Sequence, residues 1–238
     1  MSPITTVIFD MYETLVENHH DQWRATFKQI IQEQCLDVET ETLWQAWLGQ
    51  ERDFRENRIA PGREFQTYLQ GWRRSFVKAF QELSLTGDPD AACHKSIADL
   101  SQRPAFPETK EALALSRARC RIALLSNADE DYLRPNLKLL GVDFEQVLSS
   151  EEARSYKPQP GLFLEILRRL AAAPQECLYV GDRQLEDVQG AGGVGMGTVW
   201  LNRTGAPLNP DLPSPQYQID SLLELPALLT TLQTESHR

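Results

Sequence analysis

The stretch VIFDMYETLV, residues 7–16, runs from an apolar segment directly into polar side chains. Val7, Ile8 and Phe9 are β-branched or aromatic, and continuous apolar runs are typical of a parallel strand that is covered on both faces. Asp10 follows them without a break. Because Asp favours turns and also supplies a carboxylate, this residue is either a turn former or a functional group. Its role depends on which other residues reach the same end of the sheet.

Further apolar runs alternate with segments of helical periodicity. The runs that resemble strands are CRIALLSN (120–127), FEQVLSS (144–150), CLYVGD (177–182) and GTVWLN (197–202). The helical segments are PETKEALALSRA (107–118), EDYLRPNLKLLG (130–141), PGLFLEILRRLAAA (160–173) and LEDVQGAGGVG (185–195). This alternation predicts right-handed βαβ crossovers and an α/β fold with a Rossmann-like, doubly wound parallel sheet.

The alternation stops between the first strand and residue 104, where the pattern becomes almost wholly helical. Trp23, Phe27 and Ile30 recur at helical spacing, and residues 65–80 repeat apolar side chains in the same way. We therefore expect an α/β core of residues 1–16 and 104–238, with an all-helical domain of residues 17–103, the cap, inserted. Aromatic side chains at this spacing are expected to fill the core of the cap.

Composition narrows the choice of partners. The formal net charge is −10, which argues against nucleic acid and anionic membranes, because both attract clustered Lys and Arg. No basic leader or long apolar run is present, so we expect a cytoplasmic protein. Its oligomeric state, monomer or homodimer, is left open by the sequence. The 4 cysteines lack a C-x-x-C spacing and are interpreted as reduced and structural.

Several polar residues are expected to converge, because the carboxyl ends of neighbouring parallel strands meet at one edge of a sheet. Carboxylates gathered there repel one another, and burial raises their pKa values, so cations are needed to stabilise them. A lysine together with Mg²⁺, a hard ion that prefers oxygen ligands, would meet that need. The expected set is Asp10, Ser126, Asn127, Lys157, Asp182 and Asp187.

Four ordered motifs give the chain a resemblance to a known family. They are FDMYETL (9–15), LLSN (124–127), YKP (156–158) and VGDRQLED (180–187). Together they resemble the haloacid dehalogenase-like (HAD) hydrolase superfamily over almost the full length of the chain. The resemblance implies a hydrolase with a helical cap after the first motif. It also implies that Asp10 is a nucleophile, whose covalent aspartyl intermediate is hydrolysed by water.

The same resemblance implies roles for the other residues. Thr14 and Ser126 would hydrogen-bond the transferring group, and Asn127 and Tyr12 would lie beside them in the substrate site. Lys157 would orient the nucleophile and neutralise charge. Asp182 would bind Mg²⁺ together with Asp10 and the backbone carbonyl of Tyr12, and Asp187 would be a second ligand or a partner of the ligands.

Each of these residues also has a structural interpretation. Ser126 and Asn127 could cap the following helix, and Lys157 could be a solvated loop residue. Asp182 and Asp187 could be acids at the start of a helix, where the helix dipole favours them.

Tyr12 departs from the pattern of the family's phosphatases. Their first motif reads D-x-D-G-T, whereas residues 10–14 read DMYET. The missing second Asp is a general acid and base, and such a group typically contributes roughly 10²- to 10⁴-fold to the rate. The D-x-Y pattern is similar to that of 2-haloacid dehalogenases, whose halide leaves without a proton. Those enzymes work without metal and carry an early cap arginine where this chain has Gln45. Arg52 and Arg55 are nearby arginines that could take its place.

Three hypotheses follow. The first is a Mg²⁺-dependent, phosphatase-like hydrolase of a phosphorylated small molecule, weakened by Tyr12 at the position of the acid. The second is a 2-haloacid dehalogenase-type hydrolase, favoured by Tyr12. The third is a catalytically degenerate HAD-fold binding protein.

Overall fold

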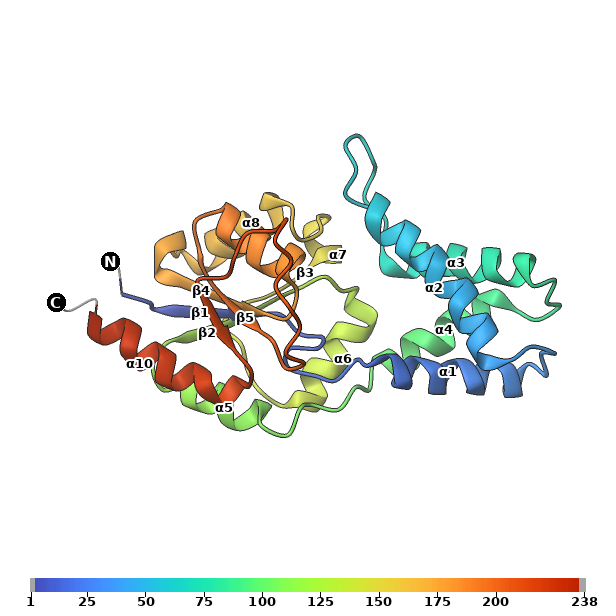
Figure 1. Cartoon of the computed structure of the whole chain (residues 1–238), viewed down its shortest axis with the longest axis horizontal. Helices are drawn as coiled ribbons and strands as arrows, with labels where there is room; N and C mark the ends of the chain where they lie inside the picture. The colour runs from blue at the N-terminus through green and yellow to red at the C-terminus, as the bar shows by residue number, and fades with distance from the viewer. Residues whose placement is uncertain (1–2, 236–238) are drawn as a thin grey trace. The chain divides into compact units, whose positions relative to one another are not determined.

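A single six-stranded parallel sheet organises the α/β part of the chain. The computed structural model describes residues 3–235, and within them the strand order is β3-β2-β1-β4-β5-β6 (Figure 1). The strands are β1 (Thr6–Phe9), β2 (Arg121–Ser126), β3 (Val147–Ser149), β4 (Cys177–Gly181), β5 (Gly197–Leu201) and β6 (Tyr217–Ile219). The predicted α/β fold with a parallel sheet is confirmed. Strand β6 was not expected, because its three residues include only one aliphatic side chain.

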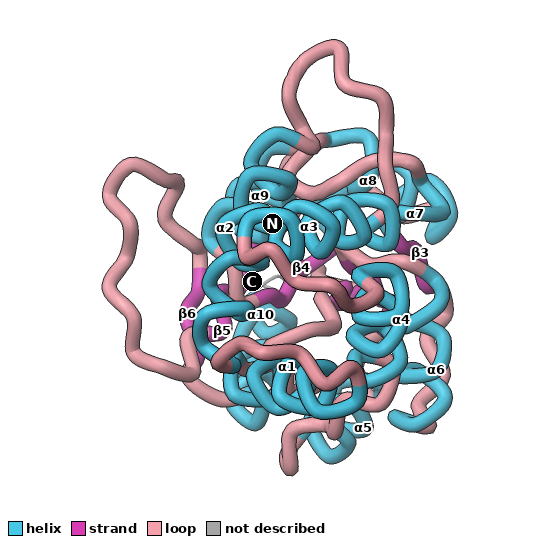
Figure 2. Tube along the Cα trace, turned by 90° about the vertical axis from the view of Figure 1, so that its right-hand side faces the viewer, coloured by secondary structure: helices cyan, strands magenta, loops and turns pink. Residues whose placement is uncertain are grey.

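Helices cover both faces of this sheet (Figures 1 and 2). Helix α8 (Pro160–Leu170) packs against one face, where Phe163 and Ile166 form a core with Ile8, Leu125 and Tyr179 from the strands. The short helices α7 (Ser150–Ala153) and α9 (Gly190–Gly193) contact α8, and α5 (Thr109–Arg117) and α10 (Leu225–Glu235) pack together on the other face. The chain between β5 and β6, residues 202–216, forms a long loop (Figure 2).

The chain divides into two compact units. The first contains residues 1–17, 104–127 and 140–238, and the second contains residues 18–103 and 128–139. The second unit is helical, with α1 (His20–Glu33), α2 (Thr40–Asn57), α3 (Tyr68–Glu82) and α4 (Pro89–Leu100), together with most of α6 (Glu130–Leu140). The boundaries expected from sequence assign residues 128–139 to the core, whereas the contacts assign them to the helical unit.

Specific contacts explain why residues 128–139 belong with the helices. Asp129 accepts hydrogen bonds from the backbone N–H groups of Tyr68 and Leu69, at 2.9 and 2.7 Å. The ring of Tyr132 stacks on Trp72, with 5.8 Å between centroids. Asn136 accepts from the Arg103 backbone N–H at 2.8 Å.

Aromatic side chains fill the helical unit, as the spacing predicts. Trp23 stacks on Trp47 with 5.2 Å between ring centroids, and Phe27 stacks on Phe76 at 5.4 Å. All four rings are buried. Among the helices of residues 3–235, none combines the length and the apolar character needed to cross a membrane.

Candidate active site

Strand β1 delivers Asp10 to the carboxyl edge of the sheet. The Asp10 backbone N–H still donates to the Val180 carbonyl at 2.9 Å, so the sheet fixes its position, and its side chain is nearly buried. Its Oδ1 atom accepts hydrogen bonds from Lys157 Nζ at 2.7 Å and from Ser126 Oγ at 3.0 Å. Its Oδ2 atom accepts none from the residues that the structure describes. The two oxygens of the Asp10 carboxylate therefore differ, because hydrogen bonds from two side chains hold only Oδ1.

The ammonium group of Lys157 is completely enclosed by acceptors. Its Nζ lies 2.7 Å from Asp10 Oδ1, 2.6 Å from Asp187 Oδ1 and 2.9 Å from the Tyr179 hydroxyl oxygen. An ammonium group has three donors, so each has a partner. Burial alone would lower the pKa of Lys157, but the carboxylates of Asp10 and Asp187 outweigh it and hold the pKa well above its ordinary value. The lysine therefore stays charged, and it is not a solvated loop residue.

Tyr179 is a member of this cluster that the sequence analysis missed. Its hydroxyl group donates to the Leu125 carbonyl at 2.8 Å, so its oxygen must accept from Lys157. Burial, the largest influence, raises the pKa of Tyr179 well above its ordinary value, which keeps the phenol neutral. The sequence did offer a signal for this residue, namely a tyrosine inside an otherwise apolar strand. A buried tyrosine hydroxyl usually needs a hydrogen-bond partner, so polar groups could have been expected beside it.

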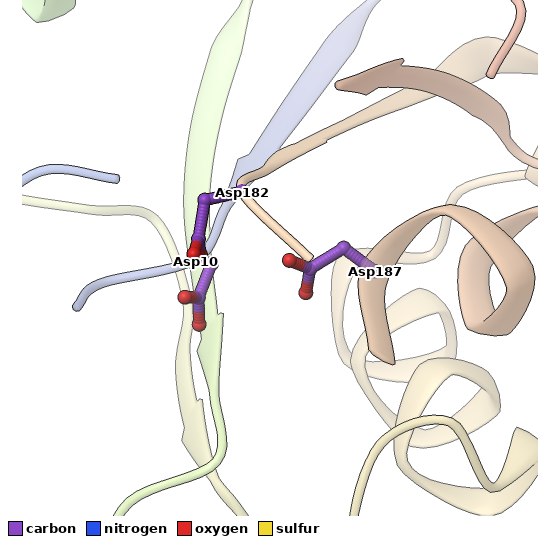
Figure 3. Close-up of side chains that lie close together, drawn as sticks. All are labelled: Asp10, Asp182 and Asp187. Atoms are coloured by element: carbon purple, nitrogen blue, oxygen red, sulfur yellow. The ribbon is translucent and has the colours of Figure 1, made fainter. Parts of the chain in front are cut away.

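Three carboxylates meet beside the lysine. Figure 3 shows Asp10 and Asp182 following neighbouring strands, with the Asp187 carboxyl group directed toward them from a helical segment. One oxygen from each lies within 4.8 Å of the others. Asp182 comes directly after β4, and Asp187 lies in a π-helical turn, Gln184–Gln189. Gly181 makes room for this turn, because a Cβ atom there would lie 2.3 Å from the Asp187 carboxyl group.

The pKa values of these acids show the strain of bringing them together. Burial, followed by the charges of Asp187 and Asp10, raises the pKa of Asp182 well above its ordinary value. Burial also raises the pKa of Asp187 to about 6, although Lys157 opposes this shift. One ammonium group thus leaves the cluster incompletely neutralised. A hard divalent ion such as Mg²⁺ fits these residues, because carboxylate oxygens are the ligands it prefers.

Asn127 and Lys157 are joined through their backbone and amide groups. The Asn127 side chain accepts from the Lys157 backbone N–H at 2.8 Å and donates to the Lys157 carbonyl at 3.2 Å. Asn127 therefore fixes the loop that carries the lysine. Ser126, at the end of β2, contacts Asp10 instead.

Thr14 offers a buried hydroxyl group with no hydrogen-bond partner among the described residues. Its backbone carbonyl accepts from Arg203 Nη2 at 3.0 Å. Arg203 also pairs with Glu108 and lies over the Phe106 ring, 3.9 Å from its centroid. The sequence analysis missed Arg203, which follows β5 in the polar loop of residues 202–216 and gives no distinctive local signal.

The residues between Asp10 and Thr14 follow a tight path. Glu13 has a φ angle of 64°, in the left-handed region that favours glycine, and its N–H donates to the Val16 carbonyl at 2.8 Å. Tyr12 forms a backbone bridge with Val16. The role of the Tyr12 carbonyl as a metal ligand stays a prediction.

The arginines suggested as halide-binding substitutes lie on α2. Arg55 pairs with the buried Glu51 at 2.8 Å, one helical turn earlier. Arg52 is exposed.

Comparison with known proteins identifies the family of this chain. The family model described as haloacid dehalogenase-like hydrolase matches residues 4–195, which is most of the chain. This chain belongs to that family. The resemblance noted from the four motifs is confirmed, and the protein is a HAD-family hydrolase.

Its relatives include both phosphatases and dehalogenases. Human N-acylneuraminate-9-phosphatase (Homo sapiens) is 34% identical over 128 residues, which cover 52% of each chain, so the chain spans about half the length of that relative. (S)-2-haloacid dehalogenase 1 of Pseudomonas sp. (strain CBS-3) is 27% identical over 237 residues, 98% of this chain and 99% of that protein. The structure of HAD-hydrolase YfnB from Bacillus subtilis bound to magnesium shares the fold, with a TM-score of 0.79, 19% identity and coverage of 96% and 99%.

Proposed function

We propose that this HAD-family hydrolase releases phosphate from a small phosphorylated molecule, with Asp10 as nucleophile and Mg²⁺ as cofactor. The observation that carries the proposal is the cluster of three carboxylates around Lys157. One oxygen each of Asp10, Asp182 and Asp187 lies within 4.8 Å of the others, and burial raises the pKa values of the latter two. Such a cluster is stabilised by a bound cation, and a phosphorylated substrate supplies the oxygen ligands that Mg²⁺ lacks.

The hydrogen bonds around Asp10 suit it for attack on phosphorus. Lys157 and Ser126 hold Oδ1, so that Oδ2 would form the bond to phosphorus while the bond to the leaving oxygen breaks. Water would then hydrolyse the aspartyl phosphate, releasing inorganic phosphate and regenerating the Asp10 carboxylate. The partnerless hydroxyl group of Thr14 is a suitable donor to a phosphoryl oxygen.

Asp10, Asp182, Asp187 and the Tyr12 carbonyl are the groups that would hold Mg²⁺. When bound, the ion would neutralise charge on the phosphoryl oxygens. The magnesium in the YfnB structure and the partial match to a phosphatase support this assignment. The formal charge of −10 favours a small-molecule substrate over nucleic acid. We also propose that the protein acts in the cytoplasm.

Tyr12 narrows the class of substrate. Position 12 provides no carboxylic acid to protonate the leaving oxygen. Substrates whose leaving group is stable as an anion, such as acyl or aryl phosphates, would therefore be hydrolysed faster than simple alkyl phosphates.

The test is phosphate release from an activated aryl phosphate, measured with Mg²⁺ and with excess chelator. We expect Mg²⁺-dependent activity that is lost in Asp10→Asn and retained in the control Asp143→Asn, which alters an exposed acid of the same unit. Wild-type activity no greater than that of Asp10→Asn would contradict the proposal.

The second candidate is hydrolytic dehalogenation of a short 2-haloacid. Tyr12 and the match to (S)-2-haloacid dehalogenase 1 along nearly the whole chain favour it, whereas the acidic cluster opposes it. Halide release from 2-chloropropionate that continues in excess chelator would establish dehalogenation over phosphate hydrolysis. A degenerate binding protein would bind Mg²⁺ and phosphate but turn over neither substrate.

A further inference from the structure

The helical unit contains a cavity of about 290 Å³ that includes no residue proposed for hydrolysis. Its lining comes from α2, α3 and the connecting loop of residues 58–67, which projects beyond the two helices (Figure 1). All of these residues belong to one compact unit. The volume is near the lower end of the range for small-molecule sites, roughly 300–1,000 Å³.

One part of the cavity lining, called its base here, is buried and closely packed. Phe54 of α2 and Ser75 of α3 are buried, and Gly71 lies one turn before Ser75 on α3. A Cβ atom on Gly71 would lie 2.6 Å from the Phe54 ring, so only glycine lets the ring pack at this depth. The Ser75 hydroxyl donates to the Gly71 carbonyl at 3.1 Å. The cavity therefore has a fixed base formed by an aromatic ring and a small polar side chain.

Positive charge surrounds this base. The lining includes four cations and two acids, in a chain whose formal net charge is −10. The cations are Arg58, Arg63, Arg74 and Lys78, and the acids are Asp53 and Glu64. The cavity thus reverses the charge balance of the protein as a whole.

Three of these cations are not neutralised by neighbouring acids. Within residues 3–235, Arg63, Arg74 and Lys78 form no ion pair with a carboxylate, and Arg74 instead donates to the Gln66 amide. Other arginines of the same unit do form ion pairs: the exposed Arg73 lies 2.6 Å from Asp90, and the partly exposed Arg24 lies 2.8 Å from Glu41. Unneutralised cations around a concave surface attract anions, because the hollow focuses their field.

We propose that this cavity is a binding site for a small polyanion, held by Arg63, Arg74 and Lys78 above the Phe54 ring. Phosphate and carboxylate groups share the chemistry that these side chains recognise, because both accept charge-assisted hydrogen bonds from Arg and Lys. The site goes beyond the proposed hydrolysis, because it requires neither Asp10 nor a metal ion.

The test is an NMR titration of the full chain, labelled with ¹⁵N, in excess chelator so that Mg²⁺-dependent binding near Asp10 is suppressed. Inorganic pyrophosphate is added in one series and citrate in another, each at constant ionic strength. We expect saturable shifts of the Gly71 and Ser75 amide signals in at least one series. A response to pyrophosphate alone assigns phosphate, a response to citrate alone assigns carboxylate, and a response to both supports the shared anion chemistry.

Matched variants locate the binding. We expect the double variant Arg74→Ala/Lys78→Ala to weaken binding at least tenfold, because it removes two charge-assisted contacts. Both side chains are exposed, so the variant should keep its fold, as circular dichroism can verify. Arg52→Ala changes an exposed α2 arginine outside the cavity and should bind like the wild type.

Two results would overturn the proposal: no saturable shift of the Gly71 and Ser75 signals with either anion, or equal binding by the double variant and the wild type. The variant Asp10→Asn separates this site from the proposed active site. It should abolish hydrolysis while leaving both titrations unchanged, and an altered anion affinity in that variant would assign the anion to the active site instead, because the substitution removes a negative charge there.

Discussion

At the scale of single residues, the central feature is the way Lys157 is held. Its three donors meet two carboxylates and one neutral hydroxyl group, so the ammonium group cannot turn away from Asp10 without leaving a donor unpaired. Tyr179 accepts from the lysine because its own hydrogen is used by the Leu125 carbonyl. We therefore propose that Tyr179 is a positioning residue that acts through Lys157.

Tyr179→Phe tests this role. The substitution keeps the ring but leaves a buried Lys157 donor without its acceptor, so we expect kcat for the aryl phosphate to fall about tenfold with little change in KM. Tyr217→Phe, which alters a partly exposed tyrosine of β6, is the matched control and should leave both parameters unchanged. If the role of Tyr179 were purely structural, the substitution would lower thermal stability without a fall in kcat at unchanged KM.

Tyr12→Asp tests the missing acid. An aspartate at this position could protonate the leaving oxygen, so phosphatase activity should rise, within a range of roughly 10²- to 10⁴-fold for alkyl phosphates. The gain should be smaller for aryl phosphates, whose leaving group needs less protonation. Comparing kcat/KM for the two substrate classes checks this expectation, and reduced activity toward both would give Tyr12 a role of its own.

At the scale of elements, the first turn of α3 depends on a residue distant in sequence. Asp129 is buried and accepts from two backbone N–H groups at the start of that helix, in addition to the Thr67 cap. A carboxylate at a helix N-terminus satisfies donors that have no partner within the helix and also interacts favourably with the helix dipole.

Removing the contact between Asp129 and the start of α3 should destabilise the protein. We expect Asp129→Ala to lower the free energy of unfolding by about 1–3 kcal/mol, because one buried and one partly buried N–H group would lose their acceptor. Asp131→Ala, at an exposed position two residues later, should change it by less than about 0.5 kcal/mol. Urea denaturation measures both, and equal values for the two variants would show that the Asp129 contact contributes nothing.

Elements and residues differ in how far the sequence predicts them. The strands around Asp10, Ser126 and Asp182 follow from local apolar runs, and the sheet then brings their ends together. Asp129 and Arg203 could not be predicted in this way, because their partners lie 60 or more residues away and their own neighbours show no special pattern. Strand β6 has only 3 residues, too few for an alternating pattern to be recognised in the sequence.

At the scale of the whole molecule, the acidic cluster opposes the stability of the metal-free protein. The raised pKa values of Asp182 and Asp187 mean that folding disfavours their charged forms. A bound cation should reverse this penalty, since a ligand that binds only the folded state stabilises it by about 2.7 kcal/mol at 100 times its dissociation constant.

Thermal unfolding of Asp182→Asn separates the destabilisation by the acidic cluster from the stabilisation by a bound cation. In excess chelator, the variant should unfold at a higher temperature than the wild type, because one crowded carboxylate is gone. With millimolar Mg²⁺, the wild type should gain stability and the variant should gain much less. Asp143→Asn, the exposed control, should respond to Mg²⁺ like the wild type. Equal stabilisation of the Asp182 variant by Mg²⁺ would remove Asp182 from the set of ligands.

The buried thiols should limit the stability of the protein at alkaline pH. Burial raises the pKa of Cys93 to about 12 and those of Cys120 and Cys177 to about 11, whereas Cys35 is exposed. Above the ordinary thiol pKa of about 8.5, the unfolded chain loses protons that the folded chain retains, so stability should decrease as pH rises from about 9 toward 11.

Two measurements check this behaviour. The urea midpoint of the wild type should fall between pH 8 and pH 10.5 more steeply than that of Cys120→Ala/Cys177→Ala. At pH 8 in native buffer, only Cys35 should react rapidly with a thiol reagent, and the other thiols should react on denaturation. Rapid reaction of several thiols in the native protein would contradict the burial that underlies the prediction.

The assignment of residues 128–139 to the helical unit has a consequence for recombining this protein with its relatives. The polypeptide passes between the two units at four points in the sequence, after residues 17, 103, 127 and 139. A graft of residues 18–103 alone would carry away Trp72 without the ring of Tyr132 and Tyr68 without Asp129. Chimeras that exchange both segments together preserve these pairs, so the helical unit should be exchanged as two segments rather than one.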